Sequence, residues 1–308
     1  MQDISIIIVN YNANTLTKAC LASLQELDVT GLRLHILVVD NASNQPFTFS
    51  EAEQKKYGGE VLTSSANLGF TGGNNLGIHH AIEKYNSDYV LLLNNDTTVA
   101  PDLLMKMVDR MNTDQQCGVL SPKIYFSPGR EFHSKSYTKK DLGTVLWYAG
   151  GSIDWLNLTA FHRGVDEVNR GQCKQQTESD FATGCCLLIR REVLEKIGLL
   201  DKNYFVYMED VDWSVKAKRS GYSVGYIDDT AVWHVNAGSS QGSGSALHQY
   251  YQTRNTLLFF FKYGSWRVRF QCSKLVVQYL STGNTYQKTA ALHFLLRQFG
   301  KQPVYIEK

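Results

Sequence analysis

ISIIIVNYN, at residues 4–12, is a β-branched apolar run that ends in two asparagines and a tyrosine. A short run of this kind, without polar alternation, is typical of a strand buried on both faces of a parallel sheet. Apolar side chains then recur at helical spacing through Leu27, with Asn14 or Thr15 as a possible helix cap. A buried strand followed by a helix begins a β-α-β unit.

The same alternation continues along the first third of the chain. Short apolar runs at residues 34–39, 61–64 and 89–93 predict strands, and residues 74–85 and 102–112 predict helices. This order predicts an α/β fold with a mainly parallel central sheet flanked by helices.

The periodicity weakens further along and then resumes. Residues 126–176 mix glycine, charge and aromatics without a period, which predicts long loops and short strands. The other predicted elements are strands at 181–189 and 222–227, helices at 191–197 and 211–220, a flexible Gly/Ser-rich segment at 237–245, and helices near 246–263 and 288–299. The end of the chain is therefore expected to be helical.

Composition excludes several classes of protein. Of 308 residues, 43% are hydrophobic and 19% are charged, which excludes a disordered chain, a collagen and a coiled coil. The net charge of +2 hides an asymmetry. Residues 1–230 carry 22 Lys and Arg against 28 acids, whereas residues 231–308 carry 9 against one. A segment of charge +8 favours an anionic partner, namely nucleic acid, a phosphorylated ligand or a membrane; a solvated basic tail is the alternative.

The cysteines and the hydropathy indicate a compartment. Six scattered cysteines form no C-x-x-C pair, so we expect small buried hydrophobes in a reducing environment. The first residues lack the basic and apolar regions of a signal peptide, and the longest apolar run, residues 257–261, is too short to span a membrane. The protein is expected to be cytoplasmic and at most peripheral to a membrane.

Polar residues follow three predicted strands at the point where each ends. They are Asn10-Tyr11-Asn12, Asp40-Asn41-Ala42-Ser43 and Asn94-Asn95-Asp96. Because open parallel sheets bind ligands outside the carboxyl ends of their strands, the clusters predict a polar ligand site in which Tyr11 stacks on a base. Asn and Asp also favour turns for local reasons, which is the alternative for any single cluster.

The segment NLGFTGGNN, residues 67–75, precedes a predicted helix. Glycines let the backbone approach a phosphate, and a helix N-terminus favours anions. The segment fits neither the dinucleotide fingerprint nor a P-loop. Phosphate binding and a tight turn without a ligand are both open at this point.

Asp96 and His234 are candidate metal ligands. A carboxylate directly after a buried strand, together with an imidazole, suits Mg²⁺ or Mn²⁺ whose shell is completed by diphosphate oxygens. A structural role is the alternative for a lone histidine.

The segment FVYMEDVDW, residues 205–213, contains Glu209, Asp210 and Asp212 at a predicted helix start. Acids are favoured there by capping and by the helix dipole, and the functional alternative is a general base. Residues 210 and 212 lie about 200° apart around a helix, so one catalytic carboxylate is expected.

Taken in order, these motifs resemble those of the family 2 glycosyltransferases, which have the GT-A nucleotide-diphospho-sugar transferase fold. The match runs from residue 4 to about residue 262. Its pieces are IIIVNYN, VVDNAS, NLGFTGGNN, LLLNNDTTV, YAGG, FATGCCLLIRREVLEKIGLLD, FVYMEDVDW, VWH and YYQTRN. Within the family the chain looks most similar to the bacterial rhamnosyltransferase-like branch, which builds cell-wall linkers, O-antigens and other surface polysaccharides.

The resemblance implies roles for individual residues. Asp210 would be the catalytic base, and Asp96 and His234 would bind a divalent cation, Mg²⁺ or Mn²⁺. Asn94 stands where the family's metal motif has an aspartate, which leaves the motif one carboxylate short. The nucleotide-sugar-binding residues would be Val9, Asn10, Tyr11, Asn12, Asp40, Asn67, Gly69, Phe70, Gly73, Asn74, Asn94 and Asn95. The residues that contact donor sugar or acceptor would be Gly151, Glu209, Trp213, Arg254 and Asn255.

The implied activity is a metal-dependent, inverting hexosyl transfer. The donor would be a nucleoside-diphosphate sugar, first of all dTDP-rhamnose, and the acceptor a glycan or a polyprenyl-diphosphate-linked saccharide. The alternatives are a UDP-hexose or UDP-galactofuranose donor, or a non-catalytic nucleotide-sugar-binding protein whose metal motif has decayed. Nucleic-acid binding is disfavoured because no such motif is present.

The resemblance divides the chain into a GT-A catalytic domain, residues 1–262, and a basic, aromatic, helical C-terminal extension, residues 263–308. Near this boundary, aromatic side chains at 259–261, 266 and 270 alternate with the cations Lys262, Arg267, Arg269 and Lys274. Aromatics among cations suit an anionic interface, so one interpretation is docking at the inner face of the plasma membrane. The other is an ordinary subdomain or a homodimer contact.

Overall fold

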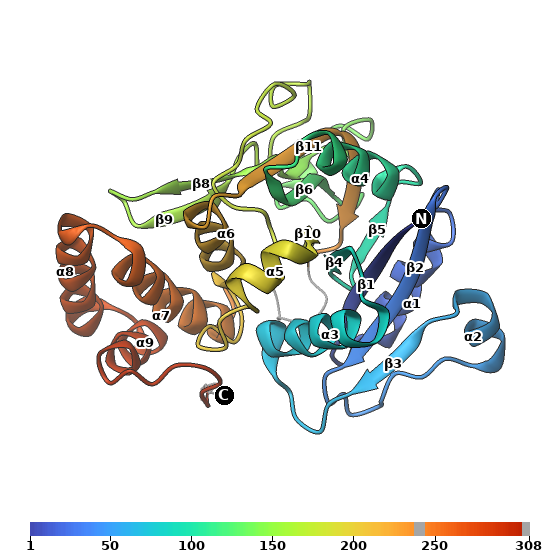
Figure 1. The fold of residues 1–308 in the computed structure, drawn as a ribbon. Coiled ribbons are helices and arrows are strands. Elements are labelled where there is room, and N and C mark those ends of the chain that lie inside the picture. The colour runs from blue at the N-terminus through green and yellow to red at the C-terminus, as the bar shows by residue number, and fades with distance from the viewer. Residues whose placement is uncertain (237–243, 304–308) are drawn as a thin grey trace.

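The computed structural model describes residues 1–236 and 244–303, so most of the segment expected to be flexible, 237–245, lies outside the described residues. A nine-stranded sheet forms the centre of the described part, with helices packed on it (Figure 1). The strands are β1 (Gln2–Asn10), β2 (Leu32–Asp40), β3 (Glu60–Thr63), β4 (Tyr89–Leu93), β5 (Thr97–Val99), β6 (Cys117–Phe126), β7 (Leu146–Tyr148), β10 (Cys186–Arg190) and β11 (Ser223–His234). A separate hairpin pairs β8 (Gly151–Asp154) with β9 (Thr159–His162).

The sheet is parallel on one side and mixed on the other. Its order is β3-β2-β1-β4-β10-β6-β11-β5, with β7 beside β6. β1 pairs in parallel with β2 and β4, as the alternation of strands and helices predicts. β10 enters antiparallel between β4 and β6, and β11 returns parallel to β6. The expected α/β fold is confirmed, but the sheet, expected to be mainly parallel, is mixed, with as many antiparallel as parallel strand pairs.

Alternate residues of β1 explain why this strand is apolar on both faces. Ile6 and Ile8 belong to a buried cluster with Cys20 and Leu21, whereas Ile7 belongs to a second cluster with Ile78. The first cluster includes residues of α1 (Asn14–Leu24) and α4 (Leu103–Thr113), and the second includes residues of α3 (Gly69–Tyr85), α5 (Arg191–Ile197) and α6 (Glu209–Arg219). Helices therefore cover both faces of the sheet, and α2 (Glu51–Tyr57) lies at the β3 edge (Figure 1).

Several predicted boundaries are wrong: β11 continues to His234 rather than ending at 227, and the last helix is Thr285–Leu295 rather than 288–299. The structure shows the cause of two further differences. α3 begins at Gly69 rather than near residue 74, because side-chain oxygens satisfy amides that a helix start leaves unpaired. Asn41 Oδ1 accepts from the amide of Leu68 at 2.9 Å, and Asn67 Oδ1 accepts from that of Gly69 at 2.8 Å. β10 begins at Cys186 rather than at 181, since residues 183–186 form a turn.

The C-terminal part is helical, as expected, and contains α7 (Ala246–Tyr263), α8 (Trp266–Thr282) and α9 (Thr285–Leu295). Phe259 and Phe260 of α7 are fully buried in the main apolar cluster, so they are core residues rather than part of an exposed aromatic surface. The predicted domain boundary falls at the end of α7. Among the described residues, no helix combines the length and the apolar character needed to cross a bilayer. All six cysteines are buried and unpaired, as expected.

Candidate active site

A cavity of about 500 Å³ opens where β1 and β4 end, beside the start of α6 and the start of α7. It brings together most of the residues singled out from the sequence. Those that line it are Val9, Tyr11, Asn67, Gly69, Phe70, Asn74, Asn94, Asn95, Asp96, Glu209, Asp210 and His234. Side chains from positions 9 to 234 therefore converge because consecutive parallel strands end at the same edge.

A buried polar network lies at the end of β1. The Asn10 amide group donates to Asp40 Oδ1 at 2.8 Å and to Asn14 Oδ1 at 2.9 Å. The Asp40 carboxylate also accepts from the amides of Ser43 and Phe47. Asn10 and Asp40 are fully buried and lie outside the lining of the cavity, so their bonds hold the strand ends on which Tyr11 sits.

The start of α3 approaches the cavity through glycines. Gly69 has a φ of +72°, and a Cβ at this position would lie 2.3 Å from the carbonyl oxygen of Phe205. A Cβ at Gly73 would lie 2.9 Å from Val9 Cγ1, so this glycine lets α3 pack against β1. Gly73 and Asn12 are outside the cavity lining, and the Asn12 side chain accepts from the amide of Asn44. The glycine-rich segment is thus a close-packed helix start.

The loop at residues 203–208 lines the cavity through its residues 205–208. Phe205, Tyr207 and Met208 all have left-handed backbone angles, with φ between 65° and 72°, although none of them is a glycine. Such a conformation costs on the order of 1–3 kcal/mol per residue and persists only where neighbouring groups hold it. This loop is therefore strained, and its shape has to be imposed from outside.

Arg254 and Asn255, on α7, impose that shape. The Arg254 guanidinium donates to the carbonyl oxygens of Asn203 and Tyr204, and the Asn255 Nδ2 lies 2.8–2.9 Å from the carbonyl oxygens of Tyr204, 206 and 207. Both side chains are fully buried and outside the cavity lining. Residues predicted to contact sugar or acceptor are thus placed where they position the loop.

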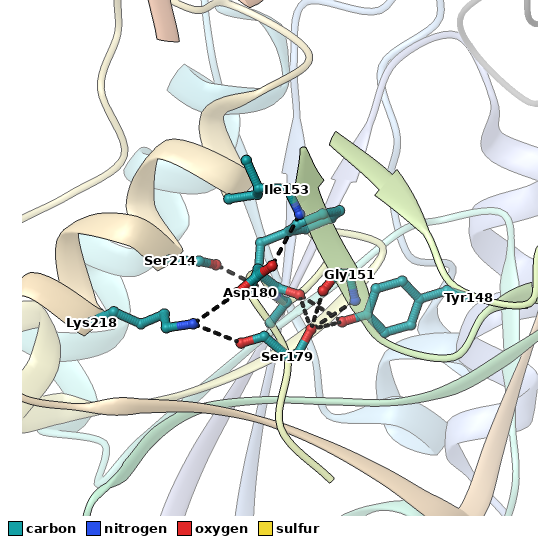
Figure 2. A network of polar contacts seen from close by, with 9 residues as sticks. Tyr148, Gly151, Ile153, Ser179, Asp180, Ser214 and Lys218 are labelled. Atoms are coloured by element: carbon teal, nitrogen blue, oxygen red, sulfur yellow. Dashed lines mark hydrogen bonds and ion pairs between the residues drawn. The ribbon is translucent and has the colours of Figure 1, made fainter. Parts of the chain in front are cut away.

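Gly151 and Trp213, also predicted to contact sugar or acceptor, lie outside the cavity lining. Figure 2 shows Ser179 bonded to both Tyr148 and Gly151. The Gly151 amide donates to Ser179 Oγ at 2.7 Å, and a Cβ at Gly151 would lie 2.4 Å from the Phe181 ring, which lines the cavity. Trp213 is buried and donates to the carbonyl oxygen of Gly198.

Asp210 and Glu209 occupy the first turn of α6. Asp210 Oδ2 accepts from the amide of Gly184 at 2.9 Å, and Oδ1 accepts from that of Val211. Burial raises the pKa of Asp210, and these two amides lower it in part. Burial, followed by the charge of Asp210, raises the pKa of Glu209 well above its usual range. Glu209 Oε2 is buried and has no hydrogen-bond partner among residues 1–236 and 244–303.

Asp96 and His234 meet because β5 begins directly after Asp96 and pairs with the end of β11. His234 Nε2 lies 3.1 Å from Asp96 Oδ1, and both side chains are buried. His234 Nδ1 is buried and lacks a hydrogen-bond partner in the described part of the chain. The facing atoms of the pair, a carboxylate oxygen of Asp96 and the Nε2 of His234, are the donor types that suit a divalent cation. The described residues contain no cluster of three or more His, Cys, Asp or Glu ligands, so a ligand would have to complete the shell.

The two asparagines before Asp96 line the cavity and connect β4 to neighbouring elements. Asn95 Nδ2 donates to Thr17 Oγ1 at 3.0 Å, which ties this side chain to α1. The Asn94 backbone amide donates to the carbonyl oxygen of Cys185, which joins β4 to the turn before β10. The structure therefore provides one carboxylate, from Asp96, at this strand end.

Several lining residues were not singled out from the sequence. Trp147 packs edge-on against both His162 and His234, with ring centroids 4.4 and 4.6 Å away. The His162 Nδ1–H donates to the carbonyl oxygen of Trp147, and burial lowers the pKa of His162 to about 4, so the ring is neutral at pH 7. Tyr207 and His248 also line the cavity, with their ring centroids 5.0 Å apart. Trp147 and His162 belong to the region without periodicity, where no local pattern marks them.

Comparison with known proteins supports the family resemblance found in the sequence. A sequence profile described as Glycosyl transferase family 2 matches residues 5–198. A low-salt glycan biosynthesis hexosyltransferase of Haloferax volcanii is 25% identical over 258 residues, covering 84% of this chain and 75% of the relative. An N-acetylglucosaminyl-diphospho-decaprenol L-rhamnosyltransferase of Mycobacterium tuberculosis is 26% identical over 265 residues, covering 82% of each chain.

The fold also has a solved counterpart. The crystal structure of GalNAc-T7 with UDP, GalNAc and Mn²⁺ matches with a TM-score of 0.65 at 15% identity, covering 96% of this chain and 56% of that one. This chain therefore spans little more than half of that neighbour. A likeness at this identity concerns the fold alone, and it confirms the expected GT-A architecture.

The buried acid Glu209 predicts a stability that falls with rising pH. Because burial raises its folded-state pKa, the folded state binds the proton more tightly than the unfolded state, whose pKa is about 4.3. The free energy of unfolding must then decrease as pH rises above about 4. Glu209→Met removes this contribution and the unpaired oxygen. We expect it to stabilise the protein at pH 8 by about 1–3 kcal/mol and to flatten the pH dependence in urea unfolding.

The matched control is Glu192→Met, which removes an exposed acid from the first turn of α5. This change should lower stability above pH 5 by a few tenths of a kcal/mol, about the size of a helix-dipole interaction, and should alter the pH dependence by no more than that amount. An unchanged pH slope in Glu209→Met would contradict the buried, unpaired state of this carboxyl.

Proposed function

This chain belongs to the Glycosyl transferase family 2, and from that membership we propose that it is a metal-dependent, inverting glycosyltransferase with Asp210 as its general base. The observation that carries the proposal is one cavity lined both by the half-buried Asp210 carboxylate and by the Asp96–His234 pair. One group can take a proton from an acceptor, and the other can hold a cation beside a leaving diphosphate.

The donor we propose is a nucleoside-diphosphate sugar, with dTDP-rhamnose first. The rhamnosyltransferase of M. tuberculosis supports this choice, and the hexosyltransferase of H. volcanii supports a UDP-hexose as the alternative; UDP-galactofuranose is a further one. We propose that the acceptor is a hydroxyl of a glycan or of a polyprenyl-diphosphate-linked saccharide, used in cell-surface polysaccharide synthesis at the inner face of the plasma membrane.

The donor's parts suit different walls of the cavity. We place the base against Tyr11 and Val9, because an aromatic ring gives a stacking surface. The diphosphate belongs near the start of α3, where Asn67, Gly69 and Asn74 line the cavity and the helix dipole favours negative charge. Asn10, Asn12, Asp40 and Gly73 would then support these groups from behind.

Asp96 and His234 would hold the divalent cation, Mg²⁺ or Mn²⁺, with diphosphate oxygens as the remaining ligands. When bound, the cation would neutralise charge on the diphosphate as it leaves. His234 is oriented for this role by the edge of Trp147 and by the pairing of β11 with β5.

Asp210 would act on the acceptor. Its carboxylate removes the proton of the acceptor hydroxyl while that oxygen forms a bond to the anomeric carbon and the bond to the diphosphate breaks on the opposite face. The electron pair of the broken bond leaves with the nucleoside diphosphate. Burial raises the pKa of Asp210, which makes its carboxylate a stronger base, and the amides of Gly184 and Val211 hold it in place. Glu209 would contact the same acceptor or the donor sugar from the neighbouring position.

Donor identity predicts a selective thermal shift. In a panel of nucleotide sugars, dTDP-rhamnose with Mn²⁺ should raise Tm by about 5 °C or more at about 100 times its Kd. Chelator should remove most of this shift, and Asp96→Asn should remove its dependence on Mn²⁺. A shift produced only by a UDP sugar would select the alternative donors, and equal shifts with and without Mn²⁺ in the unmodified protein would contradict the metal assignment.

The base role predicts that Asp210→Asn separates binding from transfer. Turnover should fall about 10²–10⁴-fold, since a positioned general base contributes this much, while calorimetry should show nucleotide affinity within a few-fold of the original. Asp212→Asn is the matched control, because Asp212 is paired with Lys262 outside the cavity. It should lower stability and retain turnover.

Near-normal turnover in Asp210→Asn would remove the base role. If the original protein binds a donor but neither transfers nor hydrolyses it across a panel of lipid-linked acceptors, the non-catalytic binding protein becomes the better interpretation.

A further inference from the structure

Helix α8 is apolar on two faces. Val268, Cys272 and Val276 are buried in the main core. A second stripe, centred about 120° around the helix from the first, is exposed to solvent: Trp266, Phe270, Val277 and Leu280 have 74%, 56%, 66% and 40% of their surface exposed. With Ser273, these positions repeat at intervals of four and three residues, which places them along one line of the helix.

This stripe is flanked by cations. Arg267 and Lys274 lie on one side of it and Arg269 on the other, by their positions around the helix, and all three are exposed. Their charged groups lie over aromatic rings of the same surface: Arg267 over Trp266 at 5.3 Å, Lys274 over Phe270 at 4.7 Å and Arg269 over Phe261 at 5.6 Å. The stripe therefore combines large exposed apolar side chains with a basic border.

α9, which packs beside α8, and the residue after it carry further exposed apolar side chains. Leu292, Leu295 and Leu296 are each about half exposed, whereas Ala290 and Ala291 on its other side are buried. Residues 244–303 contain eight Lys and Arg and no Asp or Glu. No carboxylate within this part of the chain neutralises the border of the stripe. Figure 1 shows α7, α8 and α9 grouped beside the sheet, on the side away from β1 and β2.

We propose that the exposed faces of α8 and α9 dock onto an anionic lipid bilayer, with Trp266, Phe270 and Val277 entering the interface. Exposed Trp, Phe and Leu bordered by Lys and Arg are the features of helices that lie in the plane of a membrane. Long basic side chains keep their charge at the headgroups while their stems cover apolar surface. Each cation near an anionic surface adds about 1 kcal/mol of attraction.

A second copy of the chain fits this surface less well. In a two-fold contact the same patch faces itself, so the cations on each α8 would meet those of the partner without any acid to pair with. A nucleic acid would match the positive charge, but it would offer no apolar surface to cover the exposed stripe. A bilayer with anionic headgroups satisfies both parts of the surface.

The helices connect this surface to the cavity. Leu247, His248 and Gln252 of α7 line the cavity, and α9 packs on α7 through Ala290 and a hydrogen bond between Tyr250 and His293. Docking would therefore hold the cavity at a fixed orientation to the membrane. Membrane binding can be measured without sugar transfer, so either proposal can fail without the other.

The test is flotation of the full chain with vesicles of stated composition. We expect binding to phosphatidylcholine vesicles that contain about 30 mol% phosphatidylglycerol at about 50 mM salt, and weak binding to pure phosphatidylcholine. Raising salt to about 500 mM should reduce binding several-fold, because screening shortens the range of the electrostatic attraction. Binding should fall at least tenfold, by about 1.4 kcal/mol or more, both in W266S/F270S/V277S and in R267Q/R269Q/K274Q.

Two control variants make equal changes elsewhere. Val29, Leu68 and Phe132 are exposed apolar residues outside both the β8–β9 hairpin and the C-terminal helices, and V29S/L68S/F132S should bind as the original protein does. K55Q/K139Q/K140Q, which removes three exposed lysines, should do the same. Circular dichroism and Tm check that each variant is folded.

Three results would overturn the proposal. One is absence of flotation at low salt, and another is an equal loss of binding in the control variants. The third is a concentration-dependent dimer, measured by light scattering, that the serine variant dissociates, because a second copy would then cover the surface.

Discussion

The buried contacts of Arg254 and Asn255 with the 203–208 loop are the constraint on which the candidate site depends. Three residues of this loop have left-handed backbone angles that only surrounding groups can maintain. Arg254 and Asn255 supply those groups as donors to successive carbonyl oxygens of the loop. The loop leads directly into α6, so its shape decides where Glu209 and Asp210 lie. Its Phe205 carbonyl oxygen also accepts from Thr71, which joins it to α3.

In the described part of the chain, the positive charge of Arg254 is stabilised by carbonyl oxygens and aromatic rings rather than by a carboxylate. Burial lowers the pKa of Arg254, yet a guanidinium keeps its charge in proteins. Its neighbours are carbonyl oxygens and the rings of Tyr250 and Tyr251, at 5.5 and 4.9 Å. The nearby acid Asp212 pairs instead with Lys262. Among residues 1–236 and 244–303, no cation pairs with the carboxylates of Glu209 and Asp210, and burial raises the pKa of both. Ionising these two carboxyl groups therefore lowers the stability of the folded protein.

The sequence predicts the parts of the site that depend on local pattern. Buried runs and the polar residues after them place Tyr11 and Asp96 at one sheet edge, because parallel strands end together. The resemblance adds His234 and Asp210. Local pattern does not show that α3 starts at Gly69, since the acceptor for Leu68 is Asn41, 27 positions away. For the same reason it does not show that Arg254 and Asn255 face a loop 50 residues earlier. Trp147 and His162 enter the cavity from short strands without periodicity, and the outer stripe of α8 is distinguished from its core face only once the packing is known.

The measurement that tests the central claim most directly is a crystal structure of the protein grown with Mn²⁺ and dTDP, using the anomalous scattering of Mn²⁺ to locate the ion. The account predicts an anomalous peak bonded to Asp96 and His234, a base stacked on Tyr11, and a diphosphate between the metal and the start of α3. A nucleotide bound outside this cavity, or a metal bound by other residues while Asp96 and His234 stay paired with each other, would contradict it.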